Sequence, residues 1–370
     1  MADWLQLSND LLSIIGMFCS LPPFPKPPYL ILSEPQLLKS EESAHQKRFT
    51  GSKGNWLITV DKSRMIQLLN PFSRVQIDLP SQYAFDYYFD EDYFEGHPES
   101  KQRIDISRDC FLKKVILSST PSEFSTGSKR SSSKDCIAMA CHYYHKGMAI
   151  ARPGDASWTT VETPIKDYVD DAIFLKGQFY CITGTGILMV CDVRDGLPTP
   201  KATELAEKFL TTLNNYQEKY LVEWNGELLL VFKIFLNLLF PNHNDGEEEE
   251  EEEEVEEDTK LQEYKTEKFE VFKFDFTNKK WEEVNSLGEY CLFLGFNTSV
   301  SILACDYPGC LQENCIYFTD DITFGCRDRR SPVGFDMGVF NLEDKSIQPH
   351  YKGISTCYYS PPLWMIPTPF

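Results

Sequence analysis

The chain contains 370 residues, of which 56 are Asp or Glu and 36 are Lys or Arg, so its formal net charge at pH 7 is −20. Nucleic acids and anionic membranes bind through basic faces, and this excess of acid therefore argues against either as a partner. The length suits two ordinary domains or one large β architecture with a sizeable core.

Residues 1–20 are predicted to form one short helix. Ser8 can cap it, and Leu11, Leu12, Ile15 and Phe18 recur at helical spacing. A cluster of prolines follows between residues 22 and 28 and ends any helix. Residues 21–48 are therefore expected to be a proline-rich linker and entry segment.

From residue 49 onward the pattern changes to short runs rich in Val, Ile, Phe, Tyr and Trp, which are typical of half-buried strands. Thr203 to Leu213 is the one further stretch with a helical pattern. The sequence thus predicts an all-β fold for residues 49–370. The expected strands are Asn55 to Val60, Met65 to Leu69, Val75 to Leu79, Cys136 to Tyr144, Met148 to Arg152, Trp158 to Glu162, Ala172 to Leu175, Phe179 to Thr183, Ile187 to Val193, Lys219 to Trp224, Glu227 to Phe232, Phe269 to Phe276, Trp281 to Val284, Cys291 to Phe296 and Cys315 to Phe318.

More than half of the net charge lies in one segment. Between Asp245 and Asp258 there are 12 acidic residues, and the other 44 acidic and 36 basic residues give a balance of −8. Because consecutive glutamates repel one another and cannot enter a core, residues 242–259 are predicted to be a solvated, disordered loop between two strands. The alternative is that this segment attracts basic partners.

A recurring unit indicates which all-β architecture is present. A polar turn followed by Trp or a β-branched residue and a strand begins near Asn70, Asp155, Asp192, Asp275 and Asn341, at gaps of 85, 37, 83 and 66 residues. Three of these gaps approximate one or two multiples of about 40, which is the length of a four-stranded propeller blade. The pattern favours a β-propeller of about six to eight degenerate blades over a β-sandwich.

The N-terminus lacks the basic region and cleavage site of a secretory signal peptide. The longest apolar run, Leu228 to Phe240, has 13 residues and is interrupted by Lys233 and Asn237, whereas a membrane span needs about 20. We therefore expect a soluble protein of the cytoplasm, the nucleus or both.

Twelve cysteines in a chain without a secretory signal are expected to be free and mostly buried. Cys305, Cys310 and Cys315 are each five residues apart, and Cys141-His142 is followed by His145. Neither group has the paired spacing of zinc ligands, so we expect no metal site and no cofactor.

The sequence contains no recognisable catalytic motif of the nucleophile-elbow, P-loop, zinc-protease or dinucleotide-binding type. The acidic pairs Asp170-Asp171 and Asp320-Asp321 could in principle act in acid–base chemistry, but adjacent carboxylates at a strand or turn are expected to be solvated. We therefore expect no catalytic residues, although a propeller hydrolase or oxidase stays open as a third class of function.

Several motifs resemble one family, the plant F-box proteins that carry a KIB-type β-propeller. They are GNWLITVD (Gly54 to Asp61), LLNPF (Leu68 to Phe72), LFLGFN (Leu292 to Asn297), NCIYFTDD (Asn314 to Asp321) and DMGVFNLED (Asp336 to Asp344), followed by a proline- and tryptophan-containing ending around Trp364. The resemblance covers about residues 27–370 apart from the polyglutamate loop. It implies a non-catalytic β-propeller that presents a protein substrate.

The N-terminus resembles the opening of an F-box, the helical module that binds the Skp adaptor of a cullin-RING ubiquitin ligase. The resemblance implies an adaptor-binding role for Trp4, Leu5, Leu7, Asp10, Leu11, Leu12 and Ile15. An F-box has about 40 to 50 residues, yet here Cys19-Ser20 leads directly into Leu21-Pro22-Pro23, so its second half is missing. Two readings follow: the substrate receptor of an SCF-type ligase, or a propeller binding module or decoy with no ligase link.

Overall fold

The protein is described here from a computed structural model. The structure describes residues 29–31, 47–70, 73, 75–85, 111–121, 136–142, 147–165, 167–193, 199–209, 217–236, 265–320, 336–349 and 363–365. The expected helix of residues 1–20, nearly all of the linker of residues 21–48 and the acidic loop of residues 242–259 lie outside these residues.

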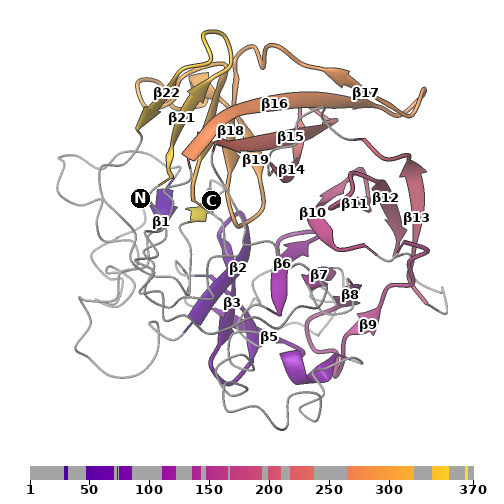
Figure 1. The fold of residues 1–370 in the computed structure, drawn as a ribbon. Helices are drawn as coiled ribbons and strands as arrows, with labels where there is room; N and C mark the ends of the chain where they lie inside the picture. Colours follow the sequence, from indigo (N-terminus) through magenta and orange to yellow (C-terminus); the bar gives the residue numbers. More distant parts are fainter. Residues whose placement is uncertain are drawn as a thin grey trace, which may run out of the picture.

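The described chain is a β-propeller, as the sequence predicts (Figure 1). Its first three blades are four-stranded sheets in which consecutive strands pair antiparallel. Blade 1 contains β2 (Lys47–Lys53), β3 (Trp56–Asp61), β4 (Ile66–Leu69) and β5 (Gln76–Leu79); blade 2 contains β6 (Leu112–Leu117), β7 (Ala138–His142), β8 (Gly147–Ala151) and β9 (Thr159–Thr160); blade 3 contains β10 (Val169–Leu175), β11 (Gln178–Thr183), β12 (Leu188–Asp192) and β13 (Lys201–Ala206).

Blade 4 repeats this arrangement, whereas blade 5 has five strands in the order β19-β18-β20-β21-β22, with β18 and β20 parallel. Short 3-10 turns η4 (Gln82–Ala84) and η8 (Ala304–Asp306) follow blade 1 and β19. Blade 4 contains β14 (Gln217–Trp224), β15 (Glu227–Leu236), β16 (Lys265–Asp275) and β17 (Lys280–Glu283); blade 5 contains β18 (Tyr290–Leu294), β19 (Val300–Leu303), β20 (Cys315–Phe318), β21 (Gly338–Asn341) and β22 (Ile347–Pro349).

The burial of each strand follows its place in a blade. β15 is buried along almost its whole length, because it lies inside its sheet and both sheet faces pack against neighbouring blades. The outermost strand β17 is largely exposed. This explains the long apolar run that begins at Leu228: it is a strand covered on both faces, as in other doubly covered sheets.

Two hairpins are closed by two-residue turns that contain glycine. Lys176-Gly177 joins β10 to β11, and Asn225-Gly226 joins β14 to β15. All four residues have positive φ, between 49° and 83°, which is the conformation of a two-residue type I′ turn. Asn and Gly tolerate this conformation, so these residues fix the register of the two inner strand pairs.

The recurring polar unit is the turn before the last strand of each blade. Asn70, Asp155, Asp192, Asp275 and Asn341 begin these turns in blades 1 to 5, respectively. The expectation of six to eight blades is therefore wrong for the described residues, in which five blades are present. Among the described residues, the gaps of 85 and 83 residues each separate the turns of two consecutive blades.

The helix expected over Thr203 to Leu213 is also wrong. Residues Lys201–Ala206 form β13, whose register places Lys201 opposite Asp192 and Ala206 opposite Leu188 of β12. Pairing with β12 completes the sheet of blade 3, and this tertiary gain outweighs the local helical preference.

The blades surround a centre lined by β2, β6, β10 and β14, the first strands of blades 1 to 4 (Figure 1). Near their C-terminal ends β2 and β6 are linked, since Lys53 Nζ donates to the carbonyl oxygens of Leu117 and Ser118 at 3.1 and 3.3 Å. These inner strands therefore run in the same direction and begin at one common end of the propeller.

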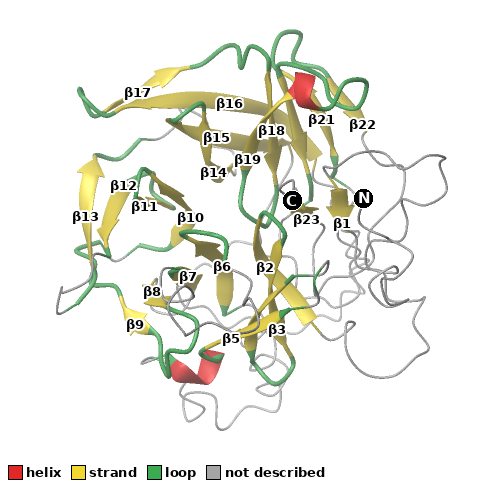
Figure 2. Ribbon diagram, turned by 180° about the vertical axis from the view of Figure 1, so that it is seen from behind, coloured by secondary structure: helices red, strands yellow, loops and turns green. Residues whose placement is uncertain are grey.

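The first and last described segments meet between blades 5 and 1 (Figure 2). β1 (Tyr29–Ile31) pairs antiparallel with β23 (Leu363–Met365). Asn297, which follows β18, donates from Nδ2 to Ser52 Oγ and to the carbonyl oxygen of Trp364, both at 2.6 Å. The Trp364 N–H donates back to Asn297 Oδ1 at 3.2 Å. Three distant parts of the chain thus share one buried side chain.

Candidate functional site

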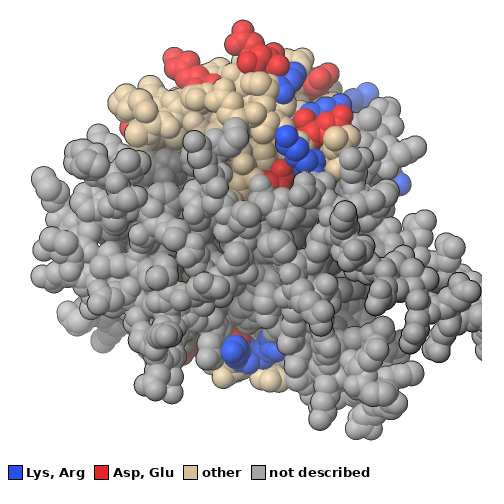
Figure 3. Space-filling view, turned by 60° about the vertical axis from the view of Figure 1, so that its left-hand side comes forward, with Lys and Arg blue, Asp and Glu red and all other residues tan. Residues whose placement is uncertain are grey.

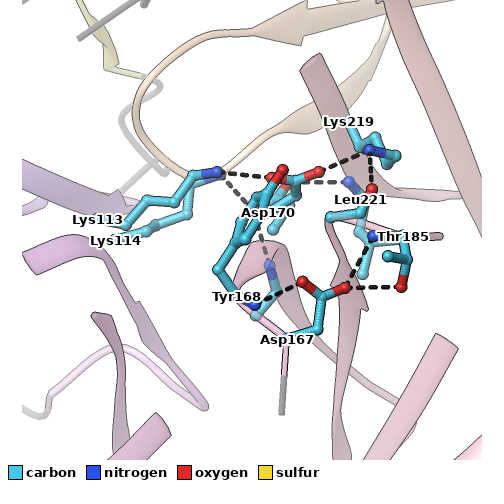
Figure 4. A network of polar contacts seen from close by, with 11 residues as sticks. Lys113, Lys114, Asp167, Tyr168, Asp170, Thr185, Lys219 and Leu221 are labelled. Carbon is cyan, nitrogen blue, oxygen red and sulfur yellow. Dashed lines mark hydrogen bonds and ion pairs between the residues drawn. The ribbon is translucent and has the colours of Figure 1, made fainter. Parts of the chain in front are cut away.

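Charged residues lie at the beginning of three consecutive inner strands. Lys113 and Lys114 lie in β6, Asp170 and Asp171 in β10, and Lys219 in β14. All five are nearly excluded from solvent, with side-chain exposures between 1% and 12%. Figure 4 shows this inner-strand charge cluster, which joins blades 2, 3 and 4 at the centre of the propeller.

Asp170 connects the blades on both sides of it. Its Oδ1 pairs with Lys113 Nζ at 3.0 Å and its Oδ2 with Lys219 Nζ at 2.7 Å. Lys219 Nζ also donates to the carbonyl oxygen of Gly184 at 2.8 Å. One carboxylate therefore pairs with two lysines, one from each neighbouring blade.

Asp171 is fully enclosed by donors. Its Oδ1 pairs with Lys114 Nζ and accepts from the N–H of Ala172 at 2.8 Å, and its Oδ2 accepts from the N–H of Leu221 at 2.8 Å. Burial raises the pKa of Asp171, while Lys114 and the N–H groups of Leu221 and Ala172 act against that rise. With both oxygens occupied, this carboxylate is suited to joining blades and not to moving protons.

Asp167 and Tyr168 form the outer edge of the cluster. Asp167 accepts hydrogen bonds from the N–H of Tyr168 and from the N–H and Oγ1 of Thr185, at 2.7 to 2.9 Å. Partial burial acts to raise the pKa of Asp167, but the hydrogen bonds, chiefly those from Thr185, lower it overall. Asp167 thereby links the backbone at Tyr168 to Thr185, in the turn between β11 and β12.

The Tyr168 side chain itself is 38% exposed. Its ring lies so close to Gly184 that a Cβ atom there would come within 2.3 Å of the ring, and Lys113 Nζ lies 5.9 Å from the ring centroid. Burial raises the pKa of Tyr168 to about 12, so the phenol stays neutral at physiological pH. A rigidly held, half-exposed tyrosine is the kind of side chain that contributes strongly to protein interfaces.

A second buried charge joins blades 4 and 5. Lys233 of β15 is 0% exposed, donates to the carbonyl oxygen of Thr319 at 3.0 Å and lies 3.4 Å from Asp336 Oδ2. Its Nζ also lies 5.0 Å from the ring centroids of Phe235 and Phe318. Asp336 in turn accepts from the N–H and Oγ1 of Thr266, at 3.0 and 2.6 Å.

The expectation that the acidic pairs are solvated is wrong for their three described members, and Asp321 lies outside the described residues. Asp170, Asp171 and Asp320 are 8%, 1% and 1% exposed. Their burial could not be read from the pairs alone, because the partners of Asp170 and Asp171 come from neighbouring blades, 49 to 57 residues away. A usable signal does exist: each of these inner strands begins with adjacent charged residues before its apolar run, as in Lys113-Lys114 and Glu218-Lys219.

The residues expected to bind an adaptor lie outside the described residues, so their role stays a prediction: Trp4, Leu5, Leu7, Asp10, Leu11, Leu12 and Ile15. Within the described ranges, no group of three or more His, Cys, Asp or Glu side chains is arranged to hold a metal ion. The same residues include no helix that is both long and apolar enough to cross a membrane. Among the eight described cysteines all are free and six are buried.

The described surface carries charges of both signs. On the face shown in Figure 3, acidic and basic side chains alternate over the upper part of the described surface. Their mixture on this face does not provide the continuous basic field that binding to a phosphate backbone requires.

Comparison with known proteins identifies the propeller. The family model of the KIB1-4 β-propeller matches residues 29–341, which is most of the chain. The chain belongs to the KIB1-4 β-propeller family.

Relatives of this KIB1-4 propeller are named as F-box proteins of Arabidopsis thaliana. The chain is 23% identical to F-box protein SKIP23 over 344 residues, covering 87% of this chain and 76% of the relative. It is 26% identical to F-box protein At2g26160, covering 72% of this chain and 73% of the relative. Putative F-box protein At1g65770 is 33% identical over 151 residues, 41% of this chain and 36% of the relative.

Proposed function

We propose that this protein is the non-catalytic substrate receptor of an SCF-type cullin-RING ubiquitin ligase. The observation that carries the proposal is the KIB1-4 propeller match, in a chain that aligns over most of its length with relatives named as F-box proteins. The propeller would hold a protein client, a Skp-type adaptor and a cullin would join it to the ligase, and partner subunits would transfer ubiquitin. This role places the protein in the cytoplasm, the nucleus or both.

Adaptor binding is assigned to the apolar face of residues 1–20. Leu11, Leu12 and Ile15 recur at helical spacing, and an amphipathic helix can lay such a face into a hydrophobic groove of a partner. An isolated helix of about ten residues is marginal in water, so this contact depends on folding upon the adaptor.

Client binding is assigned to the end of the propeller at which the inner strands begin. Tyr168 supports this assignment, since it is 38% exposed while its backbone and ring are held in place by Asp167 and Gly184. The ion pairs of Asp170 with Lys113 and Lys219 lie directly beneath it and keep blades 2, 3 and 4 in register. A fixed aromatic side chain contributes more to affinity than a mobile one, because little rotamer freedom is lost on binding.

One co-purification experiment with two variants separates the adaptor from the client. Leu11→Asp with Leu12→Asp should abolish recovery of the Skp adaptor and leave client recovery unchanged. Tyr168→Ala should reduce recovery of the same clients at least tenfold, in keeping with the loss of an interface hot spot, and leave adaptor recovery unchanged. Clients are the proteins that quantitative mass spectrometry finds enriched on the wild-type chain.

The matched control for the adaptor variant is Asn9→Asp with Ser13→Asp, which adds the same two charges away from the predicted apolar face. Adaptor recovery should survive this change. Tyr83→Ala, which removes a tyrosine that is 58% exposed and outside the cluster, is the control for Tyr168. Failure of the wild-type chain to bind any Skp adaptor at micromolar concentration would refute the ligase role.

The second candidate function is a propeller binding module or decoy without a ligase link. The proline cluster that begins at Pro22 favours it, because these prolines follow residues 1–20 directly, where the second half of an F-box would be expected to continue as helix. In that case the full-length chain should recover clients without adaptor or cullin. The Leu11→Asp, Leu12→Asp variant should then behave like the wild type in both measurements.

A further inference from the structure

Two of the eight described cysteines are exposed, Cys305 and Cys310. Cys305 lies in η8, and Cys310 ends the turn that follows it. Both belong to the connection between β19 and β20 of blade 5. Their spacing of five residues does not fit zinc ligands, but two exposed thiols on one connection can also react with disulfides.

The chain folds back twice between these cysteines. The N–H of Tyr307 donates to the carbonyl oxygen of Ala304 at 3.1 Å, and the N–H of Cys310 donates to the carbonyl oxygen of Tyr307 at 3.0 Å. Pro308 and Gly309, with φ of 79° at Gly309, occupy the centre of the second turn, as in a type II turn. Two successive turns keep both thiols on one compact surface loop.

The loop is fixed to the blade at residues other than its cysteines. Tyr307 and Leu311 pack against the buried cluster that contains Phe293 and Trp364. The N–H of Gln312 donates to the Tyr317 hydroxyl oxygen at 2.9 Å. These contacts hold the loop in place while the two thiols stay in solvent, so the thiols can react without unfolding the blade.

The buried cysteines lack this reactivity. Burial raises the pKa of Cys141 and of Cys291 to about 12, and it also raises the pKa of Cys136 and Cys315. Because the thiolate is the nucleophile, these four side chains stay protonated and unreactive at neutral pH. Exposure therefore distinguishes Cys305 and Cys310 from the six buried thiols.

We propose that Cys305 and Cys310 form a reversible dithiol modification site that reacts with low-molecular-weight disulfides. One thiolate attacks a sulfur of the reagent R–S–S–R, forming a mixed disulfide and releasing one R–S⁻. The second thiolate attacks the protein sulfur of that mixed disulfide, which forms the Cys305–Cys310 bond and releases the second R–S⁻. The two protons from the cysteines go to the two leaving thiolates, and the reagent is reduced as the protein is oxidised.

The test treats the full-length, folded chain with glutathione disulfide, then alkylates the remaining thiols and maps the peptides by mass spectrometry. The expected product is one peptide in which Cys305 and Cys310 are linked, and dithiothreitol should restore both thiols. Cys305→Ser and Cys310→Ser should each leave a mixed glutathione disulfide on the remaining cysteine. Near-ultraviolet circular dichroism checks that each surface variant is folded.

Three results would overturn the proposal. The first is a wild-type chain that carries separate glutathione adducts on Cys305 and Cys310, which would mean that the sulfurs cannot meet. The second is the absence of any reaction at either residue. The third is a linkage of either residue to another cysteine, including the four outside the described residues: Cys19, Cys110, Cys326 and Cys357.

Discussion

At the scale of single residues, Asp171 shows how the centre of the propeller depends on charge pairing. It is 1% exposed, and its oxygens accept from Lys114, Ala172 and Leu221, which lie in β6, β10 and β14. Lys114 is itself 5% exposed. Removing a buried charge leaves its partner without compensation, and that loss costs much more than the pair contributed.

We therefore expect Asp171→Asn to lower the free energy of unfolding by about 3–5 kcal/mol, because Lys114 would stay charged and buried without its carboxylate. Urea denaturation followed by tryptophan fluorescence measures this change. The matched acid-to-amide control is Glu282→Gln in β17, whose side chain is 58% exposed and lies 3.9 Å from Lys273. The control should change stability by less than about 1 kcal/mol, and an equal effect of both variants would contradict the assignment.

The sequence could predict residues whose roles are local, but not this cluster. Asp275 accepts from Thr277 and Asn278, two and three residues away, so its turn is visible in the sequence itself. Asp171 and Lys114 are 57 residues apart. Their pairing follows from the arrangement of the blades around the centre, which no local pattern encodes.

At the scale of single elements, the turn before the last strand of each blade reverses the direction of the chain. In blade 4 Asp275 Oδ1 accepts from the N–H of Thr277 at 2.7 Å and Oδ2 accepts from Asn278 Nδ2 at 2.6 Å. In blade 5 Asp344 Oδ1 accepts from the N–H of Ser346 at 2.9 Å. These hydrogen bonds, from Asn278 and from Ser346 respectively, lower the pKa of both carboxyls.

A lowered pKa in the folded state gives a stabilising contribution that is present above the unfolded-state pKa of about 3.9 and is lost as the pH falls through the folded-state value. We expect Asp275→Asn to lower the urea midpoint clearly at about pH 6, and by progressively less as the pH falls below about 3.9 and the carboxyl becomes protonated, first in the unfolded and then in the folded state. Asp344→Asn should behave in the same way in blade 5. A difference from the wild type that stays constant with pH would contradict this.

Most strands could be predicted from the sequence, whereas β13 lies where a helix was predicted over Thr203 to Leu213. The two outcomes have one physical reason. Strands such as Trp56–Asp61 contain β-branched and aromatic residues that pack on a pleated surface whatever their partner is. β13 instead contains Lys, Glu and Ala, which favour a helix locally, and it becomes a strand because β12 offers an unpaired edge. Edge strands of this kind depend on their neighbours more than on their own sequence.

At the scale of the whole molecule, one buried asparagine helps to join the last blade to the first. Asn297 is 2% exposed and joins Ser52 of β2 to Trp364 of β23 through three hydrogen bonds. Nearby, the Arg48 guanidinium lies 5.0 Å from the centroid of the Phe296 ring. The propeller is therefore held together here by side chains as well as by the short β1–β23 pair.

We expect Asn297→Ala to lower stability by about 1–3 kcal/mol, because the buried Ser52 hydroxyl and the N–H and carbonyl of Trp364 would each lose a hydrogen bond. Hydrogen–deuterium exchange should increase in β1, β2 and β23 and stay unchanged in β11 and β15. Asn55→Ala, in the turn between β2 and β3 of blade 1, is the control, since Asn55 is 8% exposed and its Oδ1 accepts no hydrogen bond. Uniformly faster exchange through all blades would show that Asn297 does not act at this junction.

The number of blades could not be derived from the sequence, although the all-β propeller could. Each blade supplies one polar turn, but the chain between successive turns varies from 37 to 85 residues. Long surface connections add little to the cost of folding, because closure entropy grows slowly with length. When connections vary this much in length, the spacing between recurring turns no longer gives the number of blades.

The parallel pairing of β18 with β20 affects the order in which the molecule can assemble. In blades 1 to 4 each strand pairs with the next along the chain, so a blade can form by adding consecutive hairpins. In blade 5 the chain must place β19 against one edge of β18 and then return to the other edge, where Cys291 lies opposite Cys315. Blade 5 therefore cannot form by adding consecutive hairpins alone, because β20 has to pass β19 before it pairs with the free edge of β18.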